Sequence, residues 1–187
     1  MSKTRPEWSQ EIARREDDLL ALRRDFHRHP ELSHQERRTA EIIAERLHAA
    51  KLDVRAGVGG TGVVGVLHGD RPGPTIAWRA DIDALPLTEL LEAPFASGTP
   101  GVMHACGHDG HTAMLLAAAK YLAQTRNFDG TVNFIFQPAE EGAPDGERGG
   151  ASLMLEEGLF GIAKPEAVFG LHVGSALLQH LSDAGDG

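Results

Sequence analysis

The residues best suited to chemistry gather in one short stretch, residues 103–111, which read MHACGHDGH. This stretch contains the only cysteine of the chain and three of its ten histidines. In an extended loop, residues two apart point the same way, so Cys106 and His108 are expected to face one point in space. A thiolate and an imidazole suit zinc, and sites with added carboxylates also take manganese, cobalt or nickel. The alternative is a buried structural cysteine beside histidines that cap a helix, but this density of ligand types favours a metal site.

Further polar side chains follow three predicted strands, at the point where each strand ends: Asp81 and Asp83 after strand 75–80, Glu140 and Glu141 after strand 130–137, and His172 after strand 167–171. Taken singly, these residues also fit solvated turn carboxylates and a strand-end histidine. Strands of an open α/β sheet, however, hold ligands at their carboxyl ends, so the side chains are expected to converge. This convergence is the main indication of an enzyme.

The adjacent pair Glu140 and Glu141 suggests how an amide could be hydrolysed. Neighbouring residues of an extended backbone project to opposite sides, so one carboxylate is expected to bind metal while the other faces water. Amide hydrolysis needs both roles, since a metal must activate water and polarise the carbonyl while a carboxylate carries the proton to the leaving nitrogen.

The elements that must position these residues alternate along the chain. Helices are expected over residues 6–29, from the segment 33–36 to 50, over 112–123 and over 151–157; strands are expected over 53–56, 63–68, 75–80, 130–137 and 167–171. Ser33 and Glu36 form an S-x-x-E capping box for the second helix. Apolar residues on both faces of strand 130–137 predict a central strand covered by helices. The sequence therefore predicts an α/β fold, a three-layer α/β/α sandwich with a mixed central sheet.

The glycine-rich segment 57–62 resembles a phosphate loop only superficially. No Lys-Ser or Lys-Thr pair follows it, and the next element is a strand rather than a helix. We interpret it as a hairpin turn, with nucleotide binding as the less favoured alternative.

Composition narrows the range of partners and compartments. The formal net charge is −9, with no basic run, which argues against nucleic acid and anionic membrane surfaces as partners. One cysteine cannot form an internal disulfide, and the first thirty residues are too charged for a signal peptide. No apolar run approaches the length of a membrane span. A soluble, cytoplasmic protein is expected.

Four motifs, in this order, closely resemble the metal-dependent amidohydrolases that include hippurate hydrolases, N-acyl-amino-acid deacylases and indole-acetyl-amino-acid hydrolases. The motifs are residues 79–86 (RADIDALP), 103–111 (MHACGHDGH), 137–142 (QPAEEG) and 170–173 (GLHV), and residues 26–32 (FHRHPEL) match the amino-terminal segment of that family. The resemblance covers roughly residues 19–173, and four ordered motifs make a chance match improbable.

The resemblance implies a zinc-peptidase-like fold and a site for two divalent metal ions, manganese or zinc, with cobalt or nickel as alternatives. It implies that the metal ligands are Cys106, His108, Glu141 and His172, with Cys106 as a bridge, that Glu140 is the general acid/base, and that Asp83 orients a ligand. The implied substrates are N-acyl amino acids, which such enzymes cleave to a carboxylate and a free amino acid.

The end of the chain departs from the family pattern. Residues 1–173 are expected to form the N-terminal part of the catalytic domain, and residues 174–187 a divergent, poorly ordered tail. The lid and dimerisation domain of the family is expected to be absent, so that the fold is incomplete at its carboxyl end. The alternative function is a catalytically inactive, truncated fragment that binds metal or a partner protein, with self-association through surface that the lid would cover.

Overall fold

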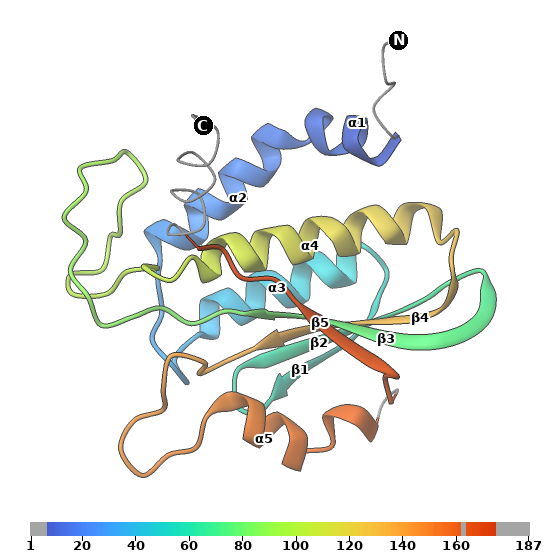
Figure 1. Ribbon diagram of the computed structural model, residues 1–187. Coiled ribbons are helices and arrows are strands. Elements are labelled where there is room, and N and C mark those ends of the chain that lie inside the picture. The colour runs from blue at the N-terminus through green and yellow to red at the C-terminus, as the bar shows by residue number, and fades with distance from the viewer. Residues whose placement is uncertain (1–6, 162–163, 175–187) are drawn as a thin grey trace, which may run out of the picture.

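A mixed sheet lies between two helical layers in the computed structural model, which describes residues 7–161 and 164–174 (Figure 1). Its strands are β1 (Asp53–Val58), β2 (Gly62–His68), β3 (Arg71–Asp81), β4 (Asp129–Gln137) and β5 (Ala167–Gly170). They lie in the order β1-β2-β4-β3-β5. Strands β3, β4 and β5 run parallel, whereas β2 is antiparallel to both β1 and β4. The expected mixed sheet is therefore confirmed, and the carboxyl ends of β3, β4 and β5 share one edge.

The helices cover both faces of this sheet unequally. On one side lie α1 (Glu7–Arg14), α2 (Glu16–Arg28), α3 (Arg37–Ala49) and α4 (His108–Thr125); on the other lie α5 (Gly150–Glu156) and the 3-10 turn η1 (Leu159–Gly161) (Figure 1). This arrangement is the expected three-layer sandwich. Among the residues that the structure describes, no helix is both long enough and apolar enough to cross a membrane.

Strand β4 is the middle strand and carries apolar side chains on both faces, as predicted. Phe134 and Phe136 pack in the larger core beneath α2, α3 and α4. Ile135 points the other way and packs with Met154 of α5. Each large apolar side chain that is fully buried stabilises the fold by about 1.5–3 kcal/mol. Two cores thus hold β4 in place, which fixes the position of the loop after Gln137.

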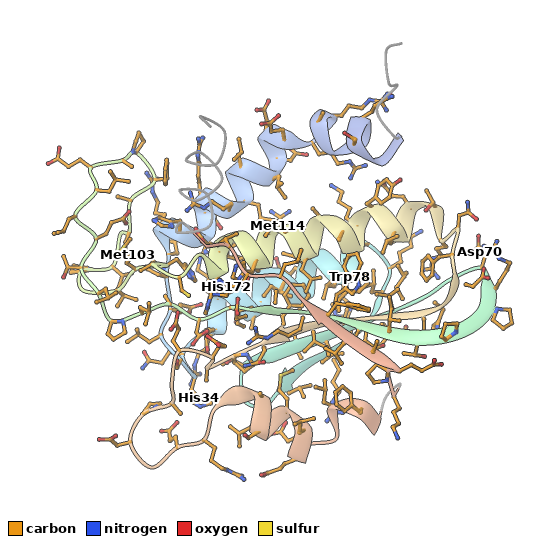
Figure 2. The ribbon with its side chains drawn as sticks, in the orientation of Figure 1. His34, Asp70, Trp78, Met103, Met114 and His172 are labelled. Atoms are coloured by element: carbon orange, nitrogen blue, oxygen red, sulfur yellow. The ribbon has the colours of Figure 1, made fainter. Side chains whose placement is uncertain are left out.

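Helix α4 is less enclosed than its apolar sequence predicts. Leu115, Leu116 and Ala119 are buried against the sheet and the neighbouring helices. Met114 remains 39% exposed, at the helix surface labelled in Figure 2. The physical reason is that the sheet, α2 and α3 leave one side of α4 uncovered in the described part of the chain.

The predicted capping box at the start of α3 is wrong. Glu36 is the residue before the helix, but its side chain makes no capping hydrogen bond. Instead, the backbone N–H groups of Arg38 and Thr39 donate to the carboxylate of Glu31, at 3.0 and 2.8 Å. Ser33 and Glu36 are engaged elsewhere, with the loops of the functional site.

Other element boundaries differ from expectation in small ways. The first predicted helix is interrupted at Arg15, which separates α1 from α2. The glycine-rich segment is a hairpin turn between β1 and β2, as predicted. Helix α4 begins at His108 rather than Thr112, because Gly107 adopts a left-handed φ of 83° and lets the helix start directly after it.

Candidate metal centre

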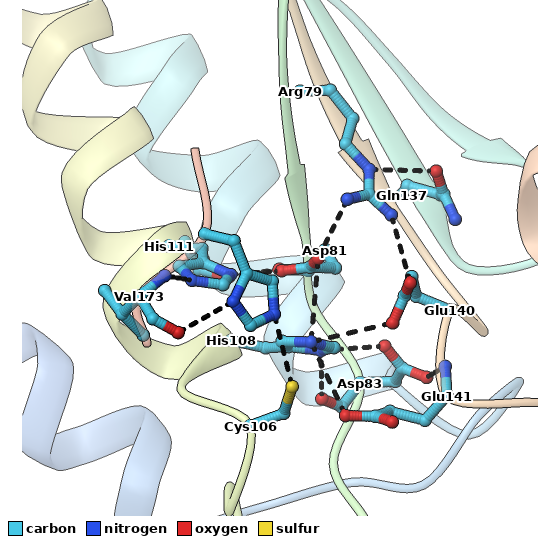
Figure 3. Close-up of polar contacts among 12 residues, drawn as sticks. Arg79, Asp81, Asp83, Cys106, His108, His111, Gln137, Glu140, Glu141 and Val173 are labelled. Atoms are coloured by element: carbon cyan, nitrogen blue, oxygen red, sulfur yellow. Dashed lines mark hydrogen bonds and ion pairs between the residues drawn. The ribbon is translucent and has the colours of Figure 1, made fainter. Parts of the chain in front are cut away.

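The six residues predicted for the site lie in one connected cluster, where three strand ends meet the amino end of α4 (Figure 3). Loops after β3, β4 and β5 bring in Asp83, the pair Glu140 and Glu141, and His172. Cys106 comes from the loop just before α4, and His108 is the first residue of that helix. Cys106 and His108 converge although the backbone turns helical at His108, so the extended loop assumed from the sequence is wrong.

His108 is the centre of this cluster and is fully buried. Its Nδ1 lies 3.0 Å from the backbone carbonyl oxygen of Asp83 and 3.1 Å from the carboxylate of that residue. A carbonyl oxygen only accepts hydrogen bonds, so Nδ1 carries a proton, and in the neutral ring Nε2 therefore carries the lone pair. This Nε2 faces the carboxylates of Glu141 at 3.5 Å, Asp81 at 3.6 Å and Glu140 at 3.7 Å.

Two atoms of the cluster lack the partners that buried polar groups normally have. Within the described residues, His108 Nε2 and Glu141 Oε1 are buried without a hydrogen-bond partner. Buried polar atoms are rarely left unsatisfied unless water or an ion binds them. A lone pair and a carboxylate oxygen that face each other fit a bound cation.

Cys106 and His172 lie together beside His108. Cys106 Sγ lies 3.3 Å from His172 Nε2. His172 Nδ1 donates to the carbonyl oxygen of Val173 at 2.7 Å, so its Nε2 presents a lone pair toward the sulfur. Burial and the nearby carboxylates, that of Glu141 first, raise the pKa of Cys106 to about 12. The thiol therefore needs a cation beside it before it can serve as a thiolate ligand.

In the part of the chain that the structure describes, three groups of side chains are compact enough to hold an ion. Each residue offers one ligand atom, and the ligand atoms of a group lie within 4.8 Å of one another: Cys106, His108 and His172; His108, Glu140 and Glu141; and Asp81, His108 and His111. All three share His108. Sulfur, imidazole nitrogen and carboxylate oxygen are donors that suit zinc and manganese. The residues present therefore fit the metal site that the sequence predicts.

The pair Glu140 and Glu141 does not project to opposite sides, as an extended backbone would require. Both carboxylates reach His108, because Ala139 has a left-handed φ of 46° and bends the loop. The two environments still differ, since the side chain of Glu140 is 38% exposed and that of Glu141 is 18% exposed. Glu140 also lies 4.0 Å from Arg79.

Asp83 joins two of the predicted ligands. One carboxylate oxygen faces His108 Nδ1, and the other accepts hydrogen bonds from the backbone N–H of Glu141 at 2.9 Å and from Ser33 Oγ at 2.8 Å. Burial alone would raise the pKa of Asp83, but these hydrogen bonds lower it below the ordinary value. Asp83 is thus ionised and oriented to hold both residues.

Asp81 and His111 form a contact that was not predicted from the sequence. His111 Nδ1 lies 2.5 Å from Asp81 Oδ1. Burial would raise the pKa of Asp81, but the His111 hydrogen bond and the positive charge of Arg79 help to lower it below the ordinary value. Residues three apart share a helix face, so a helix that begins at His108 presents His108 and His111 on one side, and this is the side that meets Asp81.

Comparison with known proteins gives a consistent result. Residues 77–184 match the model of peptidase family M20/M25/M40. A hippurate hydrolase from Campylobacter jejuni is 46% identical over 162 residues, which are 87% of this chain and 41% of that protein. The thermostable carboxypeptidase 2 of Saccharolobus solfataricus is 45% identical over 163 residues, which are 86% of this chain and 40% of that protein.

A solved structure extends this result to the fold. A Bacillus subtilis protein, described as a dinuclear metal binding peptidase of the M20 family, superposes with a TM-score of 0.77 at 45% identity. The match covers 84% of this chain and 43% of that chain. These matches confirm the resemblance seen in the four motifs, and the chain spans about 40% of the length of the relatives it matches.

Proposed function

Because this chain belongs to peptidase family M20/M25/M40, we propose that it is the metal-binding part of a hydrolase that cleaves the amide bond of N-acyl amino acids. The observation that carries the proposal is the buried pair His108 Nε2 and Glu141 Oε1, 3.5 Å apart and without hydrogen-bond partners in the described chain. The name of the hippurate hydrolase supports the substrate class, since hippurate is an N-acyl amino acid. Residues 1–173 are proposed as the N-terminal part of the catalytic domain.

The proposed ligands of two divalent ions are Cys106, His108, Glu141 and His172. The mixture of sulfur, nitrogen and oxygen donors supports zinc or manganese, and cobalt or nickel also match it. When bound, such ions lower the pKa of water and polarise the amide carbonyl.

Glu140 is the proposed general acid/base. Its carboxylate lies 3.7 Å from His108 Nε2, so it is next to the reaction centre, and its partial exposure leaves room for water and substrate. Glu140 accepts the proton from the attacking water and returns it to the leaving nitrogen, so that a carboxylic acid and a free amino acid result. Asp83 supports this reaction by holding His108 and Glu141 in place.

The test is hydrolysis of hippurate and of N-acetyl amino acids by the metal-loaded protein. Replacement of a general acid/base costs about 10²- to 10⁴-fold in rate, so Glu140→Gln is expected to lose that much. Glu45→Gln, at an exposed position of α3, is the matched control and is expected to keep the full rate. Equal turnover by Glu140→Gln would remove Glu140 from its role. Metal binding without any turnover would favour the inactive, metal-binding fragment instead.

A further inference from the structure

We propose that His111 is a positioning residue, which holds the segment His172–Val173 against the first turn of α4 and does not bind metal. The inference rests on the proposed function insofar as His172 is a metal ligand. His111 lies close enough to Asp81 and His108 for the three to share an ion, so its role must be decided from its hydrogen bonds.

Both ring nitrogens of His111 are engaged with protein groups. The backbone N–H of Val173 donates to His111 Nε2 at 2.9 Å. A backbone amide can only donate, so this Nε2 uses its lone pair as the acceptor. The proton of the neutral ring therefore lies on Nδ1, which donates to Asp81 Oδ1 at 2.5 Å. No lone pair remains on the ring for a metal ion.

Asp81 is itself fixed, so it dictates this tautomer. Its second carboxylate oxygen accepts from Arg79 Nη1 at 2.9 Å. Its backbone carbonyl accepts from Thr112 Oγ1 at 3.1 Å, in the same turn of α4 as His111. The hydrogen bonds thus run from Arg79 on β3 through Asp81 and His111 to Val173, as Figure 3 shows.

The segment after β5 has few other contacts among the described residues that could hold it in place, so the hydrogen bond between Val173 and His111 matters for its position. Strand β5 has four residues and, within the described chain, pairs with β3 alone. Leu171 and Val173 are 78% and 47% exposed, so apolar packing contributes little to holding the segment in place. The His111 contact supplies a fixed acceptor directly beside His172.

Gly107 completes the attachment. A Cβ at this position would lie 2.4 Å from Cγ2 of Val173, so only glycine lets the segment approach so closely. Gly107 and His111 thus hold Val173 against the first turn of α4. His108 is the first residue of that helix and Cys106 directly precedes Gly107, so the contact places His172 beside Cys106 and His108.

Two substitutions of His111 test the hydrogen bonds of the two ring nitrogens separately. In His111→Asn, the side-chain amide takes the place of Nδ1 and can donate to Asp81, but the acceptor for Val173 is lost. In His111→Gln, the amide oxygen takes the place of Nε2 and can accept from Val173, but the donor to Asp81 is lost. We expect His111→Asn to lower zinc affinity by about 10- to 100-fold, as loss of a residue that orients a ligand does. His111→Gln is expected to recover most of that affinity. Equal losses in the two variants would overturn the inference.

Two measurements on the metal-free protein do not depend on the proposed function. Two-bond ¹H–¹⁵N correlation spectra should show His111, assigned by its absence in His111→Gln, as the Nδ1–H tautomer, and zinc should leave it so. The amide of Val173 should be protected from hydrogen exchange in the parent protein and in His111→Gln, but not in His111→Asn. An Nε2–H tautomer, or equal exchange of Val173 in all three proteins, would contradict the inference even if no metal binds. If the tautomer and the amide exchange are as expected but the protein does not bind zinc, the result would instead count against the proposed function.

Discussion

The buried carboxylate of Glu36 accepts a hydrogen bond from the backbone N–H of Ala139 at 2.8 Å, across 103 positions of sequence. Its other oxygen accepts from Thr61 Oγ1 at 2.6 Å. Ala139 has a left-handed φ of 46°, a backbone conformation that residues other than glycine rarely adopt. Glu140 and Glu141 follow it directly. The hydrogen bond that Glu36 accepts from Ala139 therefore fixes the bend that turns both carboxylates toward His108.

Replacing Glu36 is expected to disturb the metal site from a distance. Glu36→Ala leaves the N–H of Ala139 and the hydroxyl of Thr61 without acceptors, which costs about 1–3 kcal/mol for each group that stays buried. We expect a lower free energy of unfolding, measured in urea, and weaker zinc binding. Glu31→Ala is the control, because it removes the cap of α3 at a cost of about 1 kcal/mol without touching the Ala139 loop. Unchanged zinc affinity in Glu36→Ala would contradict this role.

Asp83→Asn should weaken metal binding although the replacement has the same shape. An amide cannot accept from both His108 Nδ1 and the N–H of Glu141, since only one of its two terminal atoms is an acceptor. Loss of a residue that orients ligands typically costs about 10- to 100-fold in metal affinity. Calorimetric titration with zinc measures the effect. Ser33→Ala removes one neutral donor to Asp83 and should change the affinity far less, so equal losses would count against the orienting role.

His27 predicts a pH-dependent contribution to stability. The hydrogen bond to Asp109 at 2.7 Å raises the pKa of His27 above 6.5, and burial acts against this rise. Of the other neighbours, Glu89 raises the pKa further and Arg23 lowers it. Because the folded-state pKa is the higher one, this stabilisation is complete below about pH 6.5 and is lost as the pH rises through the folded-state value. His27→Gln should therefore cost about 2 kcal/mol near pH 6 and clearly less near pH 9.

Urea unfolding of the metal-free protein at the two pH values tests this prediction. His68→Gln is the matched control, because the side chain of His68 is 60% exposed and should contribute within about 0.5 kcal/mol at either pH. A cost for His27→Gln that does not change with pH would show that His27 does not act through its charge.

Two glycines of the same helix start predict opposite effects on stability. Gly107→Ala places a Cβ 2.4 Å from Val173 and forces a left-handed φ of 83° on alanine, which costs about 1–2 kcal/mol before the clash is counted. Gly110→Ala meets nothing within 4 Å and lies in the helix, where alanine is favoured by about 0.5–1 kcal/mol. Thermal unfolding compares the two variants, and a stabilising Gly107→Ala would contradict the close approach of Val173 to the start of α4.

Patterns that depend on neighbours in sequence predicted most of the fold. The alternation in strand β4 correctly placed Phe134 and Phe136 on one face and Ile135 on the other. The glycine-rich segment was correctly interpreted as a hairpin turn. The positions of Asp83, Glu141 and His172 after predicted strands indicated that they lie at one edge of the sheet, where these residues do come together.

Contacts between distant residues explain what the sequence did not reveal. Ser33 and Glu36 have the types and spacing of a capping box, but Asp83 and Ala139, 50 and 103 positions away, engage their side chains instead. The bend at Ala139 is likewise fixed from outside the loop, so an extended backbone was the wrong assumption for the glutamate pair. No local pattern records such partners.

The most direct test of the account is a titration of the purified protein with Co²⁺, followed by absorption spectroscopy. The chain has a single cysteine, so any thiolate-to-cobalt charge-transfer band must come from Cys106. This band is expected to grow to saturation in the parent protein and to be weaker or shifted in His172→Gln. In Cys106→Ser the band is expected to be absent. Cobalt binding without the band, or no binding at all, would contradict the proposed metal centre.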